Sequence, residues 1–246
     1  MDNLTEFKNL KSGNLLREGQ IIVEGRKGFL KLLQSDFEIK KIIISDKLIE
    51  DYSHLNVVRE KAIVVSEEEL RSFTGFNYHK GILALAQRNL YSDLAELHPP
   101  YLVLNGLTSP ENVGSIIRTC AGFGFKSIII DRECVSPYLR RCIRVSMGNI
   151  FNVKVHQTNN LLDTLKKLQV PIIGTANTPN SKKINDWIPV GNEAIIIGSE
   201  GHGIDSHILE KCDQIYKIPV DNFVNHLNAS VAAAIFLYHF DNTKIS

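Results

Sequence analysis

The segment that most constrains the fold is residues 218–238, near the C-terminal end of the sequence. A run of almost entirely apolar side chains, residues 231–238, predicts a helix that is apolar on nearly every face. Such a helix must be buried on all sides. The stretch just before it is polar, and it contains Asn225, His226, Asn228 and Ser230. These polar groups are then buried too and need hydrogen-bond partners, so the sequence predicts that other polar loops converge here.

Two glycine-containing polar loops upstream can supply those partners. Residues 109–114 follow an apolar run at 101–104, and residues 198–203 follow an apolar run at 194–197. In open α/β sheets, ligands bind outside the carboxyl ends of the strands. Three loops of this kind, each beside a strand or helix, therefore predict one composite site rather than three separate turns.

Composition places the chain among ordinary globular proteins. It has 246 residues, of which 43% are hydrophobic and 22% are charged, as in soluble domains. No apolar run reaches the roughly 18 residues of a membrane-spanning helix. The N-terminal residues lack the basic region and apolar core of a secretory signal. We therefore expect a cytoplasmic protein without a membrane partner.

The cysteines and the net charge limit the kinds of metal site and nucleic-acid surface that the chain can have. Cys120, Cys134, Cys142 and Cys212 have no Cys-x-x-Cys spacing and do not cluster with histidines, so no metal site is predicted and structural roles are favoured. The formal net charge of +1 excludes a globally basic nucleic-acid binder. A local basic surface stays open.

Residues 13–90 are predicted to form a small α/β unit. Short β-branched or apolar runs indicate strands, and they lie at 40–45, 62–65 and 81–86. Residues 18–25 are predicted to form a helix with an acidic start. Ser66, followed by three glutamates, predicts a capped helix start.

A boundary is expected at residues 89–100, where charges, a histidine and the pair Pro99-Pro100 gather. We therefore divide the chain into domains at 1–95 and 96–246. Beyond the boundary, strand-like and helix-like runs alternate, which is typical of a parallel sheet covered on both faces. The predicted strands are 101–104, 127–131, 171–175, 194–198 and 215–217, and the helices between them are 110–121, 137–147, 160–168 and 204–211.

Each of the three loops also has a purely structural interpretation. Ser109, which precedes a proline, is a good helix N-cap. Gly114 can serve close helix packing, and Arg118, four residues later on the same face, can be a surface charge. Glu200 can lie in a tight turn, and Asn228 can cap the last helix.

The glycines of Gly122-Phe-Gly124 do not form a dinucleotide-binding motif. Such a motif follows a strand and opens a helix, whereas these glycines follow a predicted helix and precede a predicted strand. Gly122 is better explained as a helix C-cap. This order argues against a nicotinamide-dependent oxidoreductase, the alternative from another enzyme class.

In their order and spacing, the three loops resemble the motifs of the SpoU family (also called the TrmH family) of RNA ribose 2′-O-methyltransferases, in the SPOUT class. The first motif, Asn-x-Gly-x-x-x-Arg, is matched by Asn112, Gly114 and Arg118. The second is matched by Gly198, Glu200, Gly201 and Gly203. The third is matched by Ile218, Pro219, Leu227, Asn228, Ser230, Val231 and Ala232. The resemblance covers roughly residues 100–240.

Two further segments extend the resemblance, and one position departs from it. Residues 144–148 are similar to the family's Arg-x-Ser-Met-Gly segment, and His79-Lys-Gly81 is similar to a His-x-Gly mark of the small domain that often precedes it. His226 stands where the family usually has serine, and imidazole is larger and titrates near neutrality. This departure leaves open a non-catalytic RNA-binding protein with a retained SPOUT fold.

The resemblance implies a fold, a cofactor and a reaction. The implied fold is α/β: a parallel-sheet SPOUT domain with a C-terminal trefoil knot, preceded by a small α/β substrate-binding domain. The implied cofactor is S-adenosylmethionine, the implied assembly is a homodimer, and the implied partner is RNA. The reaction transfers a methyl group to a ribose 2′-hydroxyl of tRNA or rRNA.

Residue roles follow in the same way. The resemblance implies a catalytic set of Arg118, Asn112, Glu200 and Asn228, in which Arg118 is either a base or a stabiliser of the developing alkoxide. It implies cofactor contacts from Gly198, Glu200, Gly203, Ile218, Leu227 and Ser230. Local positive charge predicts RNA contacts from Arg26, Lys27, Arg132, Arg140, Arg141 and Arg144, and His226 is added at the site. A solvated helix face is the alternative for Arg132, Arg140, Arg141 and Arg144.

Overall fold

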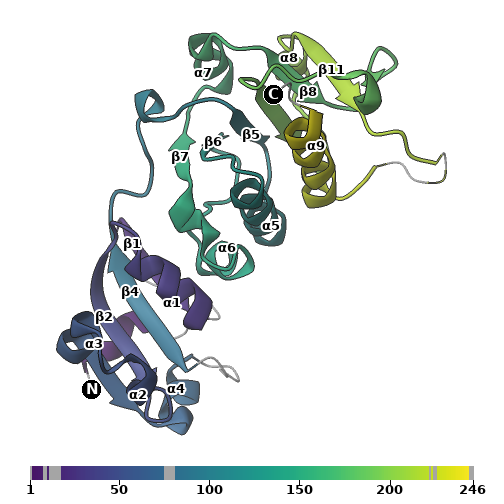
Figure 1. Cartoon of the computed structure of the whole chain (residues 1–246). Coiled ribbons are helices and arrows are strands. Elements are labelled where there is room, and N and C mark those ends of the chain that lie inside the picture. Colours follow the sequence, from purple (N-terminus) through teal and green to yellow (C-terminus); the bar gives the residue numbers. More distant parts are fainter. Residues whose placement is uncertain are drawn as a thin grey trace. The chain divides into compact units, whose positions relative to one another are not determined.

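The computed structural model describes residues 2–7, 10, 18–74, 81–221, 223 and 226–243. The chain forms two compact units, each with its own sheet (Figure 1). The first unit comprises Met1–Leu90 and Tyr138–Phe151, and the second comprises Tyr91–Pro137 and Asn152–Ser246. The sequence-based domains, 1–95 and 96–246, are continuous stretches, whereas the two units of the structure interleave along the chain.

The first unit is built on a four-stranded sheet in the order β1-β4-β2-β3. Strand β4 is antiparallel to both β1 and β2, and β3 is parallel to β2. The strands are β1 (Gln20–Glu24), β2 (Glu38–Ser45), β3 (Ala62–Val65) and β4 (Ile82–Gln87). The helices are α1 (Arg26–Leu33), α2 (Ile49–Tyr52), α3 (Asn56–Lys61), α4 (Glu67–Thr74) and α6 (Arg140–Val145).

The three strands predicted in this unit are confirmed as β2, β3 and β4, but the helix predicted over residues 18–25 is wrong. These residues form strand β1, which pairs with β4 along its whole length. Ile21, Ile22 and Val23 are all buried. Three β-branched residues in succession suit a strand that is buried on both faces better than a surface helix.

Helix α4 begins as the sequence predicts. The Glu69 N–H donates to the Ser66 hydroxyl at 3.2 Å, and the Ser66 N–H donates to the Glu69 carboxylate at 2.8 Å. This reciprocal pair is a capping box. The Ser66 hydrogen bonds lower the pKa of Glu69 below its usual value. The helix packs over one face of the sheet, whose core includes Leu4, Phe7, Leu10, Ile22, Ile43, Val65, Leu70, Leu83 and Leu85.

A buried ion pair ties α6 to the first sheet. The Glu24 carboxylate, only 2% exposed, forms ion pairs with Arg140 and, at 3.2 Å, with Arg144. Arg140 also donates to the backbone carbonyl of Leu10 at 3.0 Å. A carboxylate buried this deeply needs such cationic partners, so α6 completes the first unit although it is distant in sequence.

The segment after α6 makes a left-handed turn against α1. Met147 and Gly148 have φ of 54° and 75°, and the Gly148 N–H closes the helix by donating to the Ile143 carbonyl at 2.9 Å. A Cβ added at Gly148 would lie 3.0 Å from the Gly28 Cα. The glycine of the Arg-x-Ser-Met-Gly segment is therefore required both by its backbone conformation and by the close approach of another chain segment.

We expect Gly148→Ala to lower the free energy of unfolding by more than the about 1–2 kcal/mol that left-handed backbone costs a residue with a Cβ, because the new methyl group must also displace α1. Gly124→Ala is the matched control, since Gly124 has φ 76° and no atom within 4 Å of an added Cβ. Chemical denaturation followed by circular dichroism measures both variants. Equal losses of unfolding free energy in the two variants would show that the added methyl group at position 148 fits beside Gly28 without cost.

The second unit is a seven-stranded sheet in the order β7-β6-β5-β10-β8-β11-β9, and every neighbouring pair is parallel. The strands are β5 (Tyr101–Asn105), β6 (Ser127–Ile130), β7 (Lys154–Gln157), β8 (Ile172–Thr175), β9 (Lys182–Lys183), β10 (Ala194–Gly198) and β11 (Gln214–Lys217). The helices are α5 (Pro110–Gly122), α7 (Leu161–Leu168), α8 (Ser206–Leu209) and α9 (Ala229–Thr243). The predicted α/β class with a parallel sheet is confirmed, whereas the trefoil knot stays a prediction.

All five strands predicted for this part of the chain are present, and two more, β7 and β9, were not predicted. Both are edge strands with charged or polar side chains, so they lack the apolar run that marks a buried strand. The helices predicted over 137–147 and 204–211 are shorter than expected. The cap glycine of α5 is also different: Gly122 is the last helical residue, and Gly124, with φ 76°, makes the left-handed turn.

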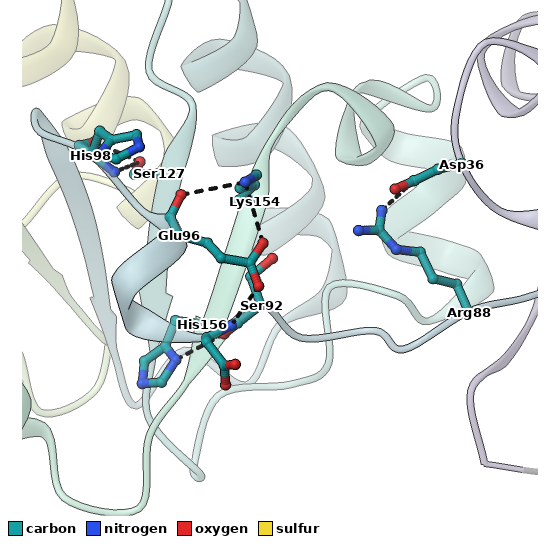
Figure 2. Close-up of polar contacts among 9 residues, drawn as sticks. Asp36, Arg88, Ser92, Glu96, His98, Ser127, Lys154 and His156 are labelled. Carbon is teal, nitrogen blue, oxygen red and sulfur yellow. Dashed lines mark hydrogen bonds and ion pairs between the residues drawn. The ribbon is translucent and has the colours of Figure 1, made fainter.

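The segment that opens the second unit runs along the exposed edge of its sheet (Figure 2). The Ser92 N–H donates to the Val155 carbonyl at 2.8 Å, and the Ser92 carbonyl bonds to the His156 ring at 3.0 Å. Further along, Glu96 pairs with Lys154 at 3.2 Å. These contacts cover β7, which would otherwise present unpaired backbone groups. Figure 2 also draws the Asp36–Arg88 ion pair of the first unit.

Helix α9 packs on α5 but is not buried on all sides, so that expectation from its sequence is wrong for a single chain. One face, formed by Ala229, Ala233, Phe236, Leu237 and Phe240, is buried. On the other side, Val231 is 47% exposed and Tyr238 is 59% exposed. Among the described residues, no helix is long and apolar enough to cross a membrane.

Candidate functional site

A pocket of about 380 Å³ lies at the carboxyl edge of the second sheet. It is formed by the loops that follow β8, β10 and β11 and by the start of α9. Its volume falls in the range typical of small-ligand sites. Five of the six predicted cofactor contacts line it: Gly198, Glu200, Gly203, Ile218 and Leu227. The sixth, Ser230, does not line the pocket.

The loop after β10 folds back on itself at its base. The Ser199 N–H donates to the Gly203 carbonyl at 3.0 Å, and the Gly203 N–H donates to the Ser199 carbonyl at 2.9 Å. A Cβ at Gly198 would lie 2.2 Å from the carbonyl carbon of Gly203. Only glycine can therefore occupy position 198 in this loop. The fold of the loop leaves Glu200 at its tip.

One carboxylate oxygen at this tip joins the three predicted loops. Oε1 of Glu200 accepts a hydrogen bond from Asn112 Nδ2 at 2.9 Å, one from Asn228 Nδ2, and a longer one, 3.3 Å, from the Ala229 N–H. Asn228 Nδ2 also donates to Asn112 Oδ1 at 2.9 Å. The sequence prediction that these loops meet is confirmed, and a single anionic acceptor holds them together. The prediction that the polar side chains before α9 are buried is wrong for His226 and Asn228, which are exposed.

Asn228 caps the last helix, as the sequence allows, and its side chain also joins the loop cluster. Its Oδ1 accepts from the Ser230 N–H at 2.9 Å and from the Ser230 hydroxyl at 2.6 Å, and more weakly from the Val231 N–H at 3.3 Å, which caps α9. Its Nδ2 belongs to the Glu200 cluster. The two ends of one amide thus connect the start of the helix to the loop, which explains why an asparagine suits this position.

The first motif reaches the cluster through the start of α5. The Ser109 hydroxyl accepts from the Asn112 N–H at 3.4 Å and caps the helix. Asn112 is buried, so its side chain is held where it meets Glu200. Arg118 is not brought into this cluster: it is exposed and does not line the pocket. No hydrogen bond joins it to another residue in the part of the chain that the structure describes.

The predicted RNA contacts have different surroundings. Arg26 and Lys27 are exposed at the start of α1, and Arg26 pairs with Asp51 at 2.6 Å. Arg140 and Arg144 are engaged with Glu24, whereas Arg141 is exposed. In the second unit, Arg132 is exposed, and His226 is exposed and lines the pocket. His79, Lys80 and Asn225, which the sequence singles out, lie outside the described residues.

Sequence reasoning missed the part of the pocket that follows β8. The missed residues are Thr175, Ala176, Asn177 and Thr178. They lie beside the glycine loop because β8 is the neighbour of β10 in the sheet. No local pattern marks them, since strand order is a tertiary property. A backbone hydrogen bond from Ala176 to the Tyr216 carbonyl, 3.1 Å long, fixes this side of the pocket.

The cysteines are reduced and shielded. Cys120, Cys134 and Cys142 are buried and Cys212 is partly buried. Burial, reinforced by the charge of Asp131, raises the pKa of Cys134 to about 12. Burial, reinforced by Asp213, raises the pKa of Cys212 to about 12. These thiols stay protonated at neutral pH and are poor nucleophiles, in agreement with the structural roles that the sequence favours.

Residues 99–238, which include all three loops and the pocket, match the SpoU rRNA Methylase family. The chain belongs to this family. A TrmH family tRNA/rRNA methyltransferase of Staphylococcus epidermidis is 30% identical over 233 residues, which cover 89% of this chain and 94% of that protein. The resemblance inferred from the motifs is therefore confirmed, and it extends over nearly the whole chain.

Solved structures share the fold of this SpoU family chain. An S-adenosylmethionine-bound rRNA methyltransferase of Sinorhizobium meliloti superposes with a TM-score of 0.81 at 21% identity, covering 93% of this chain and 89% of that one. An RNA 2′-O ribose methyltransferase superposes with a TM-score of 0.76 at 24% identity, covering 92% and 89%. At these identities the likeness shows the fold alone.

Proposed function

We propose that this SpoU family chain is an S-adenosylmethionine-dependent enzyme that methylates a ribose 2′-hydroxyl of tRNA or rRNA. The observation that carries the proposal is the Glu200 cluster, which joins all three family motifs at the rim of one pocket. The second unit then performs the transfer, and the first unit binds the RNA. The names of the relatives, tRNA/rRNA methyltransferase and RNA 2′-O ribose methyltransferase, support this direction.

The pocket fits S-adenosylmethionine in size and in chemistry. Its volume of about 380 Å³ suits a nucleoside with an amino-acid tail. Gly198, Ile218 and Leu227 line it, and their backbone N–H and C=O groups can recognise an adenine edge. Apolar side chains from Ile197, Leu209 and Phe236 suit the faces of the base. When bound, S-adenosylmethionine supplies an activated methyl group on a sulfonium.

The residues of the chain must then make a ribose hydroxyl a better nucleophile. A hydroxyl loses its proton around the transition state, so negative charge develops on its oxygen. Arginine stays protonated in proteins, so we assign Arg118 to bind the neighbouring phosphate and stabilise this charge. Glu200 holds Asn112 and Asn228 in place, which orients the rim of the pocket around the hydroxyl.

Transfer of a tritiated methyl group from S-adenosylmethionine to RNA from cells that lack the gene tests the proposal. We expect label in RNA and none in protein, and mapping of ribose methylation with and without the gene identifies the nucleotide. Label on a base rather than a ribose would refute the 2′-O assignment. Tight RNA binding without any transfer would instead favour a non-catalytic RNA-binding protein.

The start of α1 is proposed as part of the RNA surface. Replacing Arg26 and Lys27 by alanine is expected to weaken RNA binding and to lower the slope of log affinity against log salt by about 0.7–0.9 for each phosphate that is no longer neutralised. The matched control replaces Lys40 and Lys47, two other cations of the first unit that pair with Glu38 and Glu67. An equal change in both double variants would mean that binding follows net charge alone.

We also propose that two copies pair through the apolar side of α9. Val231 and Tyr238 lie two helical turns apart on this side and are half exposed. Charged residues there, in Val231→Glu with Tyr238→Glu, are expected to shift a dimer to monomers in sedimentation at micromolar concentration. Val190→Glu, at a more exposed apolar position elsewhere, is the control. A wild type that sediments only as a monomer would refute the pairing.

A further inference from the structure

A buried polar cluster lies below the glycine loop, at the carboxyl ends of β5 and β6. Asn105 is the last residue of β5 and is 2% exposed. Its Nδ2 donates to Asp131 Oδ2 at 2.8 Å and to Asp205 Oδ2 at 2.9 Å. Its Oδ1 accepts from the Asp205 N–H at 2.8 Å. The amide therefore uses both of its hydrogens and an oxygen lone pair.

The two carboxylates belong to different parts of the site. Asp131 follows β6 and also accepts from the backbone N–H groups of Gly106, Glu133 and Cys134, at 2.8, 3.0 and 2.8 Å. Asp205 directly follows Ile204, which lines the pocket at the exit of the glycine loop. One neutral side chain thus connects the loop that leads to the first motif with the loop of the second motif.

We propose that Asn105 is a positioning residue that sets the exit of the glycine loop and so determines the affinity of the pocket for S-adenosylmethionine. The inference rests on the proposed function of this pocket. The loop is held at its tip by the Glu200 cluster and at its base by the Ser199–Gly203 pair. The bond from the Asp205 N–H to Asn105 is the third attachment, and it fixes the chain directly after Ile204.

The chemistry of the position explains why it carries an amide. Two carboxylates that lie on either side of one group repel each other, and a group that donates a hydrogen bond to each of them offsets this repulsion. Asparagine has two donor hydrogens and an acceptor on a short stem. An aspartate of the same shape has no hydrogen to donate when ionised, and it would place a third negative charge between Asp131 and Asp205.

Because an aspartate at position 105 can donate a hydrogen bond only when it is protonated, the defect of Asn105→Asp should depend on pH. The ionisable groups that face position 105 are Asp131, Asp205 and the Cys134 thiol, which donates to the Leu104 carbonyl at 3.3 Å. Like charges raise the pKa of a carboxyl that is introduced between them, so the new carboxyl at position 105 regains a proton, and with it a donor, as the pH falls. The defect of the variant should therefore be largest at high pH and smaller at low pH.

Ser127→Ala is the matched structural control. Ser127 begins β6, at the opposite end of the same strand pair, and is also buried. Its hydroxyl accepts from the His98 N–H at 3.0 Å and donates to the His98 carbonyl at 2.6 Å (Figure 2). Its loss should destabilise the same sheet without changing the carboxyl edge, where the pocket lies.

The experiment is calorimetric titration of S-adenosylmethionine into wild type, Asn105→Asp and Ser127→Ala at pH 6 and pH 8, with the melting temperature of each. We expect Asn105→Asp to raise the dissociation constant about tenfold or more at pH 8, as the loss of buried hydrogen bonds implies, and by a smaller factor at pH 6. Ser127→Ala should lower the melting temperature and leave the dissociation constant unchanged at both pH values.

A dissociation constant for Asn105→Asp equal to that of wild type, or a defect of equal size at both pH values, would overturn the inference. If Asn105→Asp does not fold, Asp205→Ala decides: Asp205 caps no helix with its side chain, and we expect a severalfold weaker affinity, whereas wild-type affinity would overturn the proposal. A wild type that binds no S-adenosylmethionine would instead refute the proposed function itself, which separates the two failures.

Discussion

Arg118→Ala is expected to slow methyl transfer by about two to three orders of magnitude or more, the cost of removing a donor that stabilises developing negative charge. The affinity for S-adenosylmethionine should stay at the wild-type value, because Arg118 does not line the pocket. Single-turnover transfer of a labelled methyl group measures the first quantity, and calorimetric titration measures the second. A loss confined to transfer is the pattern of a group that acts only in the transition state.

Two further variants define what Arg118 contributes. Arg118→Lys keeps a positive charge but loses the planar fork that binds phosphate bidentately, so its rate should lie between those of wild type and Arg118→Ala. Lys126→Ala removes an exposed cation a short distance beyond α5 and should leave the rate unchanged. Full activity of Arg118→Ala would disprove the assigned role, and a parallel loss of cofactor affinity would indicate a structural role instead.

Glu200→Ala is expected to weaken both cofactor binding and transfer. The variant removes the acceptor that Asn112, Asn228 and the Ala229 N–H share. Loss of hydrogen bonds to a charged group, about 1.5–3 kcal/mol in typical cases, corresponds to roughly a 10- to 100-fold weaker affinity. Because Glu200 is exposed, water replaces much of this interaction in the variant, so the lower part of this range is expected for binding.

Glu200→Gln separates the shape of the cluster from its charge. The glutamine oxygen can still accept from both asparagines, but the bonds are no longer charge-assisted, so this variant should fall between wild type and Glu200→Ala. Glu210→Ala removes an exposed carboxylate just after α8 and should change neither quantity. Wild-type behaviour of Glu200→Ala would mean that the three loops meet without depending on this carboxylate.

The parts of the fold that sequence predicted are those with a strong local signal. The strands β5, β6, β8 and β10 are short apolar runs, and α5 has a serine cap followed by proline. The acidic flanks of β1 resemble a helix start and predict a helix, whereas pairing with β4 makes this segment a strand. The edge strands β7 and β9 have no apolar run and depend on their neighbours.

The residues of the candidate site also fall into those that the sequence identifies and those that only the folded structure reveals. Gly198, Glu200 and Asn228 could be identified because each lies in a polar loop next to a predicted strand or helix and matches a family motif, and such loops often carry function. Asn105 was not identified, since a lone asparagine at a strand end has no distinctive pattern. Its importance depends on Asp131 and Asp205, which only the folded sheet brings to it.

The interleaving of the two units has a consequence for the order in which the protein is made. Glu24 leaves the ribosome early, but Arg140, one of its two cations, lies 116 residues later in the chain. Until α6 emerges, β1 must either keep this carboxylate hydrated or bury it uncompensated, and an unpaired buried charge typically costs about 3–5 kcal/mol. The nascent N-terminal unit therefore lacks the cations of this carboxylate while β5 and β6 are being translated, and a separately expressed fragment that ends at residue 95 would lack them as well.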